Sequence, residues 1–415
     1  MKIAGIVTEF NPFHKGHSYI LQEVKRRTGV DAVVALMSGN FVQRGEPAIF
    51  DMGIRAEAAL NNGCDVIFEL PPNTAVSSAE GFARGAIDIF NALGIDILSF
   101  GSECGDLRLL NCIAGLLANE SSVYKNALNN GLKAGLSFPA AREEALISAV
   151  KADAIEDPVE IRSILKNPNN ILGIEYLKAL ISTDSKITPF TVKRTVADYH
   201  SGIPDAEVTP ESRGYSAEEI RDLIFKGDSL SGPASDPVLK YIPDMIEKYG
   251  TVHKDRLSML LCNELNSALL SENLKAADIP EDLSKRIMNN NSYVGTFSDF
   301  CTLIKSKNIT YTAVSRYLLR LILHISPYDG STPGYVRLLG FRKDAENVLS
   351  AISARSKISI LSNSSDIRDY LKSHPSDDSL DSNLRSDRTY ELLRDDKKRK
   401  EHPLPPEIAR RLILK

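Results

Sequence analysis

The chain has 415 residues, a length at which two or three domains are expected. With 43% hydrophobic and 25% charged residues, its composition is globular and excludes disordered and fibrous classes. A net charge of −4 means that nucleic-acid binding would need a local basic face. The five cysteines are scattered, and neither a basic leader nor a run of about 18 apolar residues occurs, so we expect a cytoplasmic protein with no membrane partner.

The first 120 residues alternate short apolar runs with amphipathic helical runs, the pattern of a parallel sheet covered by helices. Residues 32–37 are apolar throughout, which is typical of a strand buried on both faces. We therefore predict a Rossmann-like, doubly wound α/β domain. The predicted strands are 3–7, 32–37, 66–70 and 95–100, and the predicted helices are 18–27, 52–61, 79–93 and 107–119.

The rest of the chain predicts a second, mainly helical domain. Beyond residue 120 the pattern is helical up to 185, strand-like at 187–192, and helical again at 217–225 and 313–325. We predict that the first domain covers 1–227, because serine, glycine, aspartate and proline then cluster up to residue 237 as in a linker. Helical periodicity dominates 238–415, and the polar stretch 362–387 is predicted as a long loop.

A polar loop with two histidines directly follows the first predicted strand. Its sequence over residues 8–17 is Thr-Glu-Phe-Asn-Pro-Phe-His-Lys-Gly-His. Ligands of open α/β sheets bind where strands end, so a site is expected in this loop. His14 and His17 can turn both rings toward one pocket, and Gly16 lets the backbone approach a phosphate closely. The following helix offers free amides to an anion.

This loop resembles the HxGH signature of the nucleotidyltransferase superfamily, which implies ATP binding with His14 and His17 at the phosphates. Two other interpretations of His14 and His17 are an ordinary pair of loop histidines and a metal site. No cysteine or acidic ligand set accompanies the pair, so we assign no metal ligands.

A second motif, Tyr-Ser-Ala-Glu-Glu-Ile-Arg at residues 215–221, resembles the late Ser-x-x-x-Ile-Arg motif of the same superfamily. Ser216 is placed to cap a helix, and Arg221 lies about one turn inside it. The resemblance implies that Arg221 contacts the β- and γ-phosphates. Taken alone, the motif is only a capped helix.

Further segments resemble the bacterial tRNA(Met) cytidine acetate ligase family, and the resemblance runs over nearly the whole chain. They are Ser-Gly-Asn-Phe-Val-Gln-Arg-Gly-Glu-Pro at 38–47, the stretch 51–58, Ser-Phe-Gly-Ser-Glu at 99–103, Asn-Pro-Asn-Asn-Ile-Leu-Gly at 167–173, Val-Lys-Arg-Thr at 192–195 and Tyr-Val-Arg-Leu-Leu-Gly-Phe at 335–341. Base or ribose contacts of a nucleotide are expected at 99–103, because this segment follows the fourth predicted strand.

The resemblance implies a set of site residues. The catalytic ones would be His14, Lys15, His17 and Arg221. The ATP-binding ones would be Val7, Thr8, Glu9, Phe10, Asn11, Pro12, Phe13, Gly16, Ser18, Tyr19, Ile20, Gly101, Asn169, Arg194 and Thr195.

Several of these assignments have alternatives. Asn170 could take the place of Asn169, Gly101 could merely turn the chain, and Arg194 could be a surface cation. Arg44 and Arg55 could steady a carboxylate or pyrophosphate by a bidentate contact, or could be solvated surface residues.

The implied reaction uses ATP, acetate and elongator tRNA(Met). Acetate would attack the α-phosphate to give acetyl-adenylate and pyrophosphate, and N4 of the wobble cytidine would then take the acetyl group. Mg²⁺ bridging phosphate oxygens is expected, with no protein ligand assigned. Basic residues that could support tRNA, or could merely pair with neighbouring acids, are Arg316, Arg320, Arg337, Arg342, Lys343 and the run 397–400.

Two rival functions come from other classes. A coenzyme adenylyltransferase, joining ATP to a mononucleotide or phosphopantetheine, would share the HxGH chemistry but would not need the long helical extension. A non-catalytic RNA-binding protein could keep a nucleotide fold, but His14, His17 and Arg221 argue against it.

Overall fold

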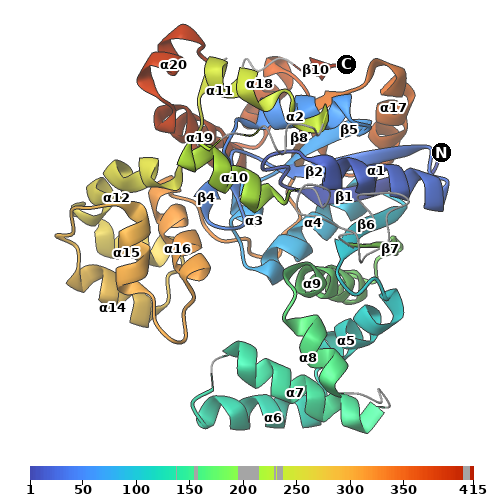
Figure 1. The fold of residues 1–415 in the computed structure, drawn as a ribbon, viewed down its shortest axis with the longest axis vertical. Coiled ribbons are helices and arrows are strands. Elements are labelled where there is room, and N and C mark those ends of the chain that lie inside the picture. Colours follow the sequence, from blue (N-terminus) through green and yellow to red (C-terminus); the bar gives the residue numbers. More distant parts are fainter. Residues whose placement is uncertain (137, 154–157, 195–214, 229, 231–236, 405–411) are drawn as a thin grey trace.

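A single eight-stranded sheet organises the molecule, as the computed structural model shows for residues 1–136, 138–153, 158–194, 215–228, 230, 237–404 and 412–415 (Figure 1). Its strand order is β10-β8-β5-β2-β1-β6-β7, with β9 paired to β8. Neighbouring strands are parallel except β5 and β8. The strands are β1 (Ile3–Thr8), β2 (Ala32–Ser38), β5 (Val66–Leu70), β6 (Ile97–Ser102), β7 (Thr188–Lys193), β8 (Tyr335–Phe341), β9 (Ser359–Leu361) and β10 (Ile413–Leu414).

Helices cover both faces of this sheet, which confirms the predicted doubly wound α/β fold. On one face, α1 (Lys15–Thr28) and α2 (Met52–Asn61) pack on a core that includes Val33 and Met37. On the other face, the core around Val34 and Leu36 carries α4 (Ala79–Leu93), α5 (Leu107–Asn119), α9 (Pro168–Ser182) and α17 (Glu346–Arg355). Burial on both faces explains why every residue of β2 is buried and its sequence is continuously apolar up to Met37.

The parallel part of the sheet, β5-β2-β1-β6-β7, reverses its winding direction between β1 and β6. At such a switch point the loops after neighbouring strands separate and leave room for a ligand. The carboxyl ends of β1, β2, β6 and β7 all lie at this edge, so the sequence segments that follow them are brought together.

Two groups of helices project from the α/β core (Figure 1). One, next to α5 and α9, consists of α6 (Ser122–Lys133), α7 (Phe138–Asp153) and α8 (Pro158–Leu165). The other, which we call the helical lobe, consists of the short 3-10 turn Lys254–Leu257, α12 (Ser258–Leu265), α13 (Leu270–Ala276), α14 (Glu281–Asn289), α15 (Phe297–Ile304) and α16 (Tyr311–Leu323). No helix within the described residues is both long enough and apolar enough to cross a membrane.

The helical lobe touches the α/β core through a small hairpin formed by β3 (Phe41–Val42) and β4 (Glu46–Pro47). The Ser315 hydroxyl on α16 donates a hydrogen bond to the Gly45 carbonyl over 2.9 Å. A Cβ atom at residue 45 would lie 2.4 Å from the Arg316 backbone nitrogen, so only glycine permits this approach. The hairpin follows β2 directly, and it therefore links the helical lobe to the carboxyl edge of the sheet.

The remaining elements complete the two sides of the sheet. They are α3 (Pro72–Ala75), α10 (Ala217–Lys226), the 3-10 turn Pro237–Leu239, α11 (Ile242–Tyr249), the 3-10 turn Lys343–Ala345, α18 (Ser364–Ser373), α19 (Asp378–Leu393) and α20 (Asp396–Glu401). The prediction of a long loop over 362–387 is wrong, because α18 and most of α19 occupy it. Asn363 and Asp377 cap these helices, and Leu380 and Leu384 are buried one turn apart. The division into 1–227 and 238–415 stays a hypothesis about function, since β8, β9 and β10 from the second range join the same sheet.

A buried polar network fastens α19 to the sheet. Arg337 on β8 is 4% exposed, and its Nη1 lies 3.1 Å from Glu69 Oε2 on β5 and 2.9 Å from Asp387 Oδ2 on α19. Asn383 Oδ1 accepts a hydrogen bond from the same nitrogen, and Asn40 donates to the other Asp387 oxygen. The expectation that Arg337 forms part of a tRNA surface is therefore wrong: its charge is compensated inside the protein.

We expect Arg337→Met to lower the free energy of unfolding by about 3–5 kcal/mol, because it leaves two buried carboxylates, those of Glu69 and Asp387, without their cation. Arg342→Met at the end of the same strand removes an exposed pair with Asp344 and should cost less than about 1 kcal/mol. Urea unfolding of both variants measures the difference. Equal losses would show that the buried network does not hold the sheet to α19.

Candidate active site

The histidine loop forms the start of α1 at the carboxyl end of β1. His14 is the N-terminal cap residue of the helix, and its Nδ1 accepts a hydrogen bond from the Gly16 amide over 3.0 Å. His17 returns the contact, since its Nδ1 accepts from the His14 amide over 3.2 Å. The two side chains thus form a reciprocal capping box, and their ring centroids lie 3.9 Å apart. Lys15 is half-buried at the first position of the helix.

These two hydrogen bonds fix which nitrogen of each ring carries the proton. A neutral imidazole has one donor nitrogen and one acceptor nitrogen, and Nδ1 is the acceptor in both His14 and His17. The proton therefore sits on Nε2, and both rings can offer an N–H to a ligand. Phe10 and Phe13 pack against His17, with ring centroids 5.0 and 5.5 Å away, and hold its ring in place.

Both histidines are neutral near pH 7. Burial, followed by the positive charges of Arg194 and Arg221, lowers the pKa of His14 to about 3. Burial also holds the pKa of His17 well below its ordinary value, and His14 and Arg194 add to this effect. The site thus presents neutral N–H donors beside fixed positive charge.

Arg221 reaches the histidine loop from α10. Ser216 caps this helix with Glu219 as the reciprocal partner, as the sequence predicted for Ser216. Arg221 Nη1 donates to the Asn11 carbonyl over 2.6 Å, and its Nη2 lies 4.0 Å from Glu46 Oε1. The structure therefore brings Arg221 together with the two histidines, although the motifs lie far apart in the sequence.

A second group of predicted site residues also lies together. Gly101 is near the end of β6, Asn169 is at the start of α9 and Arg194 directly follows β7. Arg194 Nη1 donates to Asn169 Oδ1 over 3.2 Å, and a Cβ at residue 101 would lie 3.1 Å from the Arg194 side chain. Of the two asparagines, Asn169 makes this contact, whereas Asn170 is buried and receives the Cys104 amide. Arg194 is therefore no isolated surface cation.

Glu103 is a residue of this group that the sequence did not assign. Its Oε1 accepts from Asn169 Nδ2 over 2.6 Å, and its Oε2 accepts from the Asn170 amide over 2.9 Å. The carboxylate thus caps the start of α9 and orients the asparagine that faces Arg194. An acidic residue directly after a strand at the ligand-binding edge was the available signal.

Arg44 and Arg55, for which the sequence left two interpretations open, both have partners in the structure. Arg55 is completely buried, and its guanidinium donates to the carbonyls of Glu9, Ser38, Gly39 and Phe50. It therefore holds the loops after β1 and β2 together, and the alternative of a solvated Arg55 is wrong. Arg44, at the tip of the β3–β4 hairpin, forms an exposed bidentate pair with Glu218 on α10.

The other residues of the predicted ATP loop lie around this core. Asn11 Oδ1 accepts the Ile49 amide over 2.8 Å, and the peptide bond to Pro12 is cis. The Thr8 hydroxyl and Asn11 Nδ2 are sealed from solvent and have no partner among the described residues. Val7 and Thr8 are the last two residues of β1, and Ser18, Tyr19 and Ile20 follow on the first turns of α1. Thr195 lies outside the described residues.

Glu9 points away from α1 toward the hairpin. Its Oε1 accepts the Gln43 amide over 2.9 Å, and the Gln43 carbonyl in turn accepts from Arg316 Nη1 on α16 over 3.3 Å. Gln43 therefore connects the histidine loop to the helical lobe. Among the described residues, both contacts are made by the backbone of Gln43. The identity of the side chain at this position therefore could not have revealed the connection.

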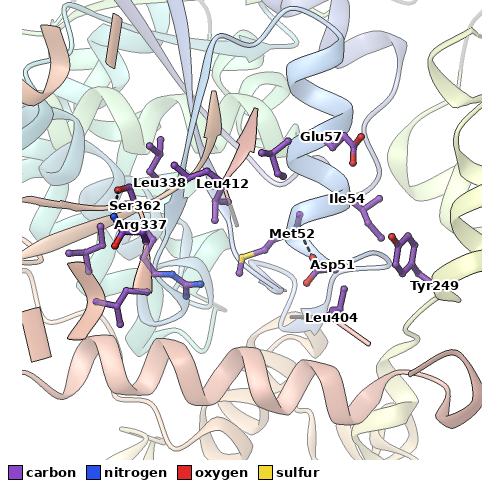
Figure 2. Close-up of a pocket in the computed structure, with 16 residues that line it drawn as sticks. Asp51, Met52, Ile54, Glu57, Tyr249, Arg337, Leu338, Ser362, Leu404 and Leu412 are labelled. Atoms are coloured by element: carbon purple, nitrogen blue, oxygen red, sulfur yellow. Dashed lines mark hydrogen bonds between the residues drawn. The ribbon is translucent and has the colours of Figure 1, made fainter. Parts of the chain in front are cut away.

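A metal centre and a cavity away from the histidine loop are the two other kinds of site to consider. Within the described ranges, no group of three or more histidine, cysteine or acidic side chains is arranged to hold a metal ion. A cavity of about 220 Å³ lies between α2, β8 and α18, and Figure 2 shows Asp51, Tyr249 and Arg337 among its walls. Its charged residues already have partners: Asp51 caps α2, Arg337 holds α19 and Glu57 pairs with Lys415. No residue of the histidine loop lines the cavity.

The neutral, buried histidines make stability depend on pH. An unfolded histidine titrates near 6.5, whereas folded His14 has a pKa of about 3. Between these values the unfolded chain binds more protons, so this stability is fully present above about pH 6.5 and is lost as the pH falls toward 3. From pH 7 to pH 5, His14 should account for a loss of about 2 kcal/mol, and His14→Gln should remove that share.

Urea unfolding at both pH values measures this loss, with His374→Gln as the control. His374 is exposed, so that variant should lose stability in acid as the wild type does. A His14→Gln protein as acid-sensitive as the control would contradict the neutral, buried state of His14.

Comparison with known proteins agrees with this geometry. The chain matches the HIGH Nucleotidyl Transferase family over residues 1–403. A tRNA(Met) cytidine acetate ligase of Halothermothrix orenii is 37% identical over 87% of each chain, and one of a Thermoanaerobacter species is 38% identical over 89% of this chain and 91% of its own. Thermotoga maritima TmcAL bound with alpha-thio ATP has a TM-score of 0.85, 28% identity and 100% coverage of both chains. This chain therefore belongs to the tRNA(Met) cytidine acetate ligase family of HIGH nucleotidyl transferases.

Proposed function

We propose that this chain activates acetate with ATP and transfers the acetyl group to N4 of the wobble cytidine of elongator tRNA(Met), in the cytoplasm. The observation that carries the proposal is the pair of imidazoles at the start of α1. Neither Nε2–H has a partner among the described residues, and both rings lie at the switch point of a doubly wound sheet, beside Arg194 and Arg221. Family membership supports the choice of acetate and cytidine.

The first step needs positioning and charge compensation more than a strong base. Acetate is already ionised and attacks the α-phosphorus, while the bond to the β-phosphate oxygen breaks and pyrophosphate leaves. His14 and His17 would donate to oxygens of the α-phosphate through Nε2–H. Lys15, Arg221 and the amides at the start of α1 would compensate the charge on pyrophosphate.

The nucleoside of ATP would lie on the β6 and β7 side of the switch point. Gly101 and Arg194 end these strands, and Asn169 and Glu103 add a hydrogen-bonded pair at the start of α9. A Mg²⁺ ion accompanying ATP would be held mainly by phosphate oxygens and water, since the described residues offer no acidic cage. Neither adenylate formation nor acetyl transfer requires a protein ligand to Mg²⁺.

In the second step N4 of cytidine attacks the acyl carbon and AMP leaves. The base must leave its stack to reach the adenylate, and an anticodon loop is already partly unstacked. The helical lobe is the favoured docking surface, because α16 contacts the hairpin next to Glu9. Arg320, however, is buried against Tyr317 and donates to the Ala277 carbonyl, so it does not serve as a phosphate contact.

Other predicted basic positions are largely paired. Arg342 forms an ion pair with Asp344, whereas Lys343 bonds the Lys415 carbonyl only through its backbone amide and its side chain is exposed. In the run 397–400, Lys397, Lys398 and Arg399 contact Glu401, the Glu247 carbonyl and Asp396 respectively. By contrast, Lys305 and Lys307, directly before α16, are exposed and have no acidic partner among the described residues.

Pyrophosphate exchange into ATP separates this function from its rivals. The proposed ligase exchanges pyrophosphate when acetate is present, with or without tRNA. A coenzyme adenylyltransferase would instead need a mononucleotide or phosphopantetheine, and a non-catalytic RNA-binding protein would show no exchange. Exchange that ignores acetate would reject the proposal.

We expect His14→Ala or His17→Ala to slow acetate-dependent exchange by about 10²-fold or more, the loss typical of one preorganised donor. Circular dichroism checks that each variant is folded. Near-normal exchange in both folded variants would remove this loop from catalysis.

We expect Lys305→Glu/Lys307→Glu to weaken tRNA binding and to lower the slope of log affinity against log salt by about one for each phosphate that is no longer neutralised. Lys186→Glu is the matched control, because Lys186 precedes β7 at the opposite, amino edge of the sheet. Filter binding over a salt series measures both. An unchanged slope in the double variant would place the docking surface elsewhere.

A further inference from the structure

Glu9 is a carboxylate in a site that must otherwise bind anions. It directly follows β1, five residues before His14, and its backbone carbonyl is held by Arg55. A negative charge there opposes acetate, the triphosphate and pyrophosphate, all of which carry negative charge themselves. A role toward a ligand group that donates hydrogen bonds is therefore the one that fits its charge.

The position of Glu9 also separates it from the nucleoside half of the site. Sheet order places β2 and β6 on opposite sides of β1. The partner of Glu9 is Gln43, in the hairpin after β2, whereas Gly101 lies near the end of β6 and Arg194 follows β7. Glu9 thus lies on the side of β1 from which the helical lobe is reached.

One oxygen of Glu9 is engaged and the other is available. Among the described residues, the hydrogen bond to the carboxylate is that of the Gln43 amide, and it is made to Oε1. The side chain is half-buried, so Oε2 is not sealed away from a ligand. The Gln43 contact fixes the carboxylate in orientation and leaves Oε2 to accept a hydrogen bond or a proton.

The chemistry of cytosine matches this arrangement. Its amino group is a hydrogen-bond donor, and glutamate or aspartate is the usual acceptor for it in base recognition. In the proposed reaction the same amino group is the nucleophile and must lose a proton. We propose that the Glu9 carboxylate receives N4 of the target cytidine and accepts its proton in the acyl-transfer step, an inference that rests on the proposed function.

The step balances without any further reactant. The N4 lone pair forms the bond to the acyl carbon, and the carbonyl electrons move to oxygen. When the carbonyl re-forms, the bond between the acyl carbon and the phosphate oxygen breaks, and AMP leaves with that electron pair. The proton from N4 passes to Glu9, which later releases it to water.

The surroundings of Glu9 make its carboxylate a stronger base than an ordinary glutamate. Burial raises the pKa of Glu9 above its ordinary value, against the lowering effects of the Gln43 amide and of Arg221. The charged and titratable groups that face it are Arg221 on α10, Arg55 on α2, Arg44 and Glu46 on the hairpin, and Tyr176 on α9. Because a base must be deprotonated, acetyl transfer should rise with pH through this titration and then level off.

The test measures the two half-reactions separately on the full chain with Glu9→Gln. Acetate-dependent pyrophosphate exchange reports adenylate formation. Single-turnover transfer from preformed acetyl-adenylate to a tRNA(Met) transcript, read as N4-acetylcytidine, reports the second step. We expect transfer to fall by about 10²–10⁴-fold, the range of general-base catalysis, and by at least about 10-fold more than exchange falls.

The pH profile distinguishes a proton acceptor from a residue that merely supports the hairpin. The rise of the transfer rate with pH should disappear in Glu9→Gln, whose amide oxygen can still accept the Gln43 amide. Glu57→Gln is the control: Glu57 pairs with Lys415 on the outer side of α2, so this variant should keep the wild-type profile.

Three results would overturn the proposal. They are a parallel loss of both half-reactions, an unchanged transfer rate, and a slowed transfer that keeps its dependence on pH. A wild-type chain without acetate-dependent exchange is a different outcome: it rejects the proposed function itself, and the role of Glu9 with it.

A measurement on the wild-type chain covers the case in which Glu9→Gln does not fold. A transcript with uridine at the wobble position offers an acceptor oxygen where cytidine has its amino group. With AMP present, we expect it to bind at least about 10-fold more weakly above the Glu9 titration, since each base-edge contact discriminates by about 1–3 kcal/mol. Equal binding of the two transcripts would exclude this contact.

Discussion

The reciprocal capping of α1 by His14 and His17 is the interaction on which the site depends. It satisfies two backbone amides at the start of the helix and, by using Nδ1 of both rings, leaves Nε2 of each ring as the N–H donor. The same bonds therefore begin the helix and set the tautomers. A substitution that broke them would disturb the helix start and the proposed phosphate donor together. The three-residue spacing of the two histidines is that of a capping box, which joins the N-cap residue to N3.

Two buried arginines with partners inside the protein hold the loops and strands around this capping box. Arg55 gathers four carbonyls from the segments after β1 and β2, and Arg337 joins β5, β8 and α19 through two carboxylates. Both arginines are almost fully buried, where an uncompensated charge would be costly. The carboxyl edge of the sheet is thus built as a rigid polar layer, and a preorganised site needs such a support.

The sequence located the α/β core well, because periodicity reports which faces are buried. Strands β1, β2, β5 and β6 begin and end within two residues of their predicted bounds, and Ser216 caps α10 as expected. Periodicity does not report pairing between distant segments. It could not show that β8 returns to the sheet, that Arg320 and Arg337 are internal, or that α18 and α19 fill a stretch whose polarity suggested a loop. The sequence alone does not show whether the charge of an arginine is compensated by solvent or by a buried carboxylate.

The neutrality of the histidines also answers a problem of charge. A site for a triphosphate needs positive charge when it is full, but two buried imidazolium ions would be unstable when it is empty. Burial and the nearby Arg194 lower the pKa of both rings, and Arg221 adds to this effect at His14, so both rings are neutral without a ligand. Each ring remains a hydrogen-bond donor in this neutral form, because Nδ1 accepts a backbone amide and Nε2 carries the proton. The rings can therefore stabilise negative charge on a phosphate without carrying a buried positive charge themselves, while Lys15, Arg194 and Arg221 supply the full charges.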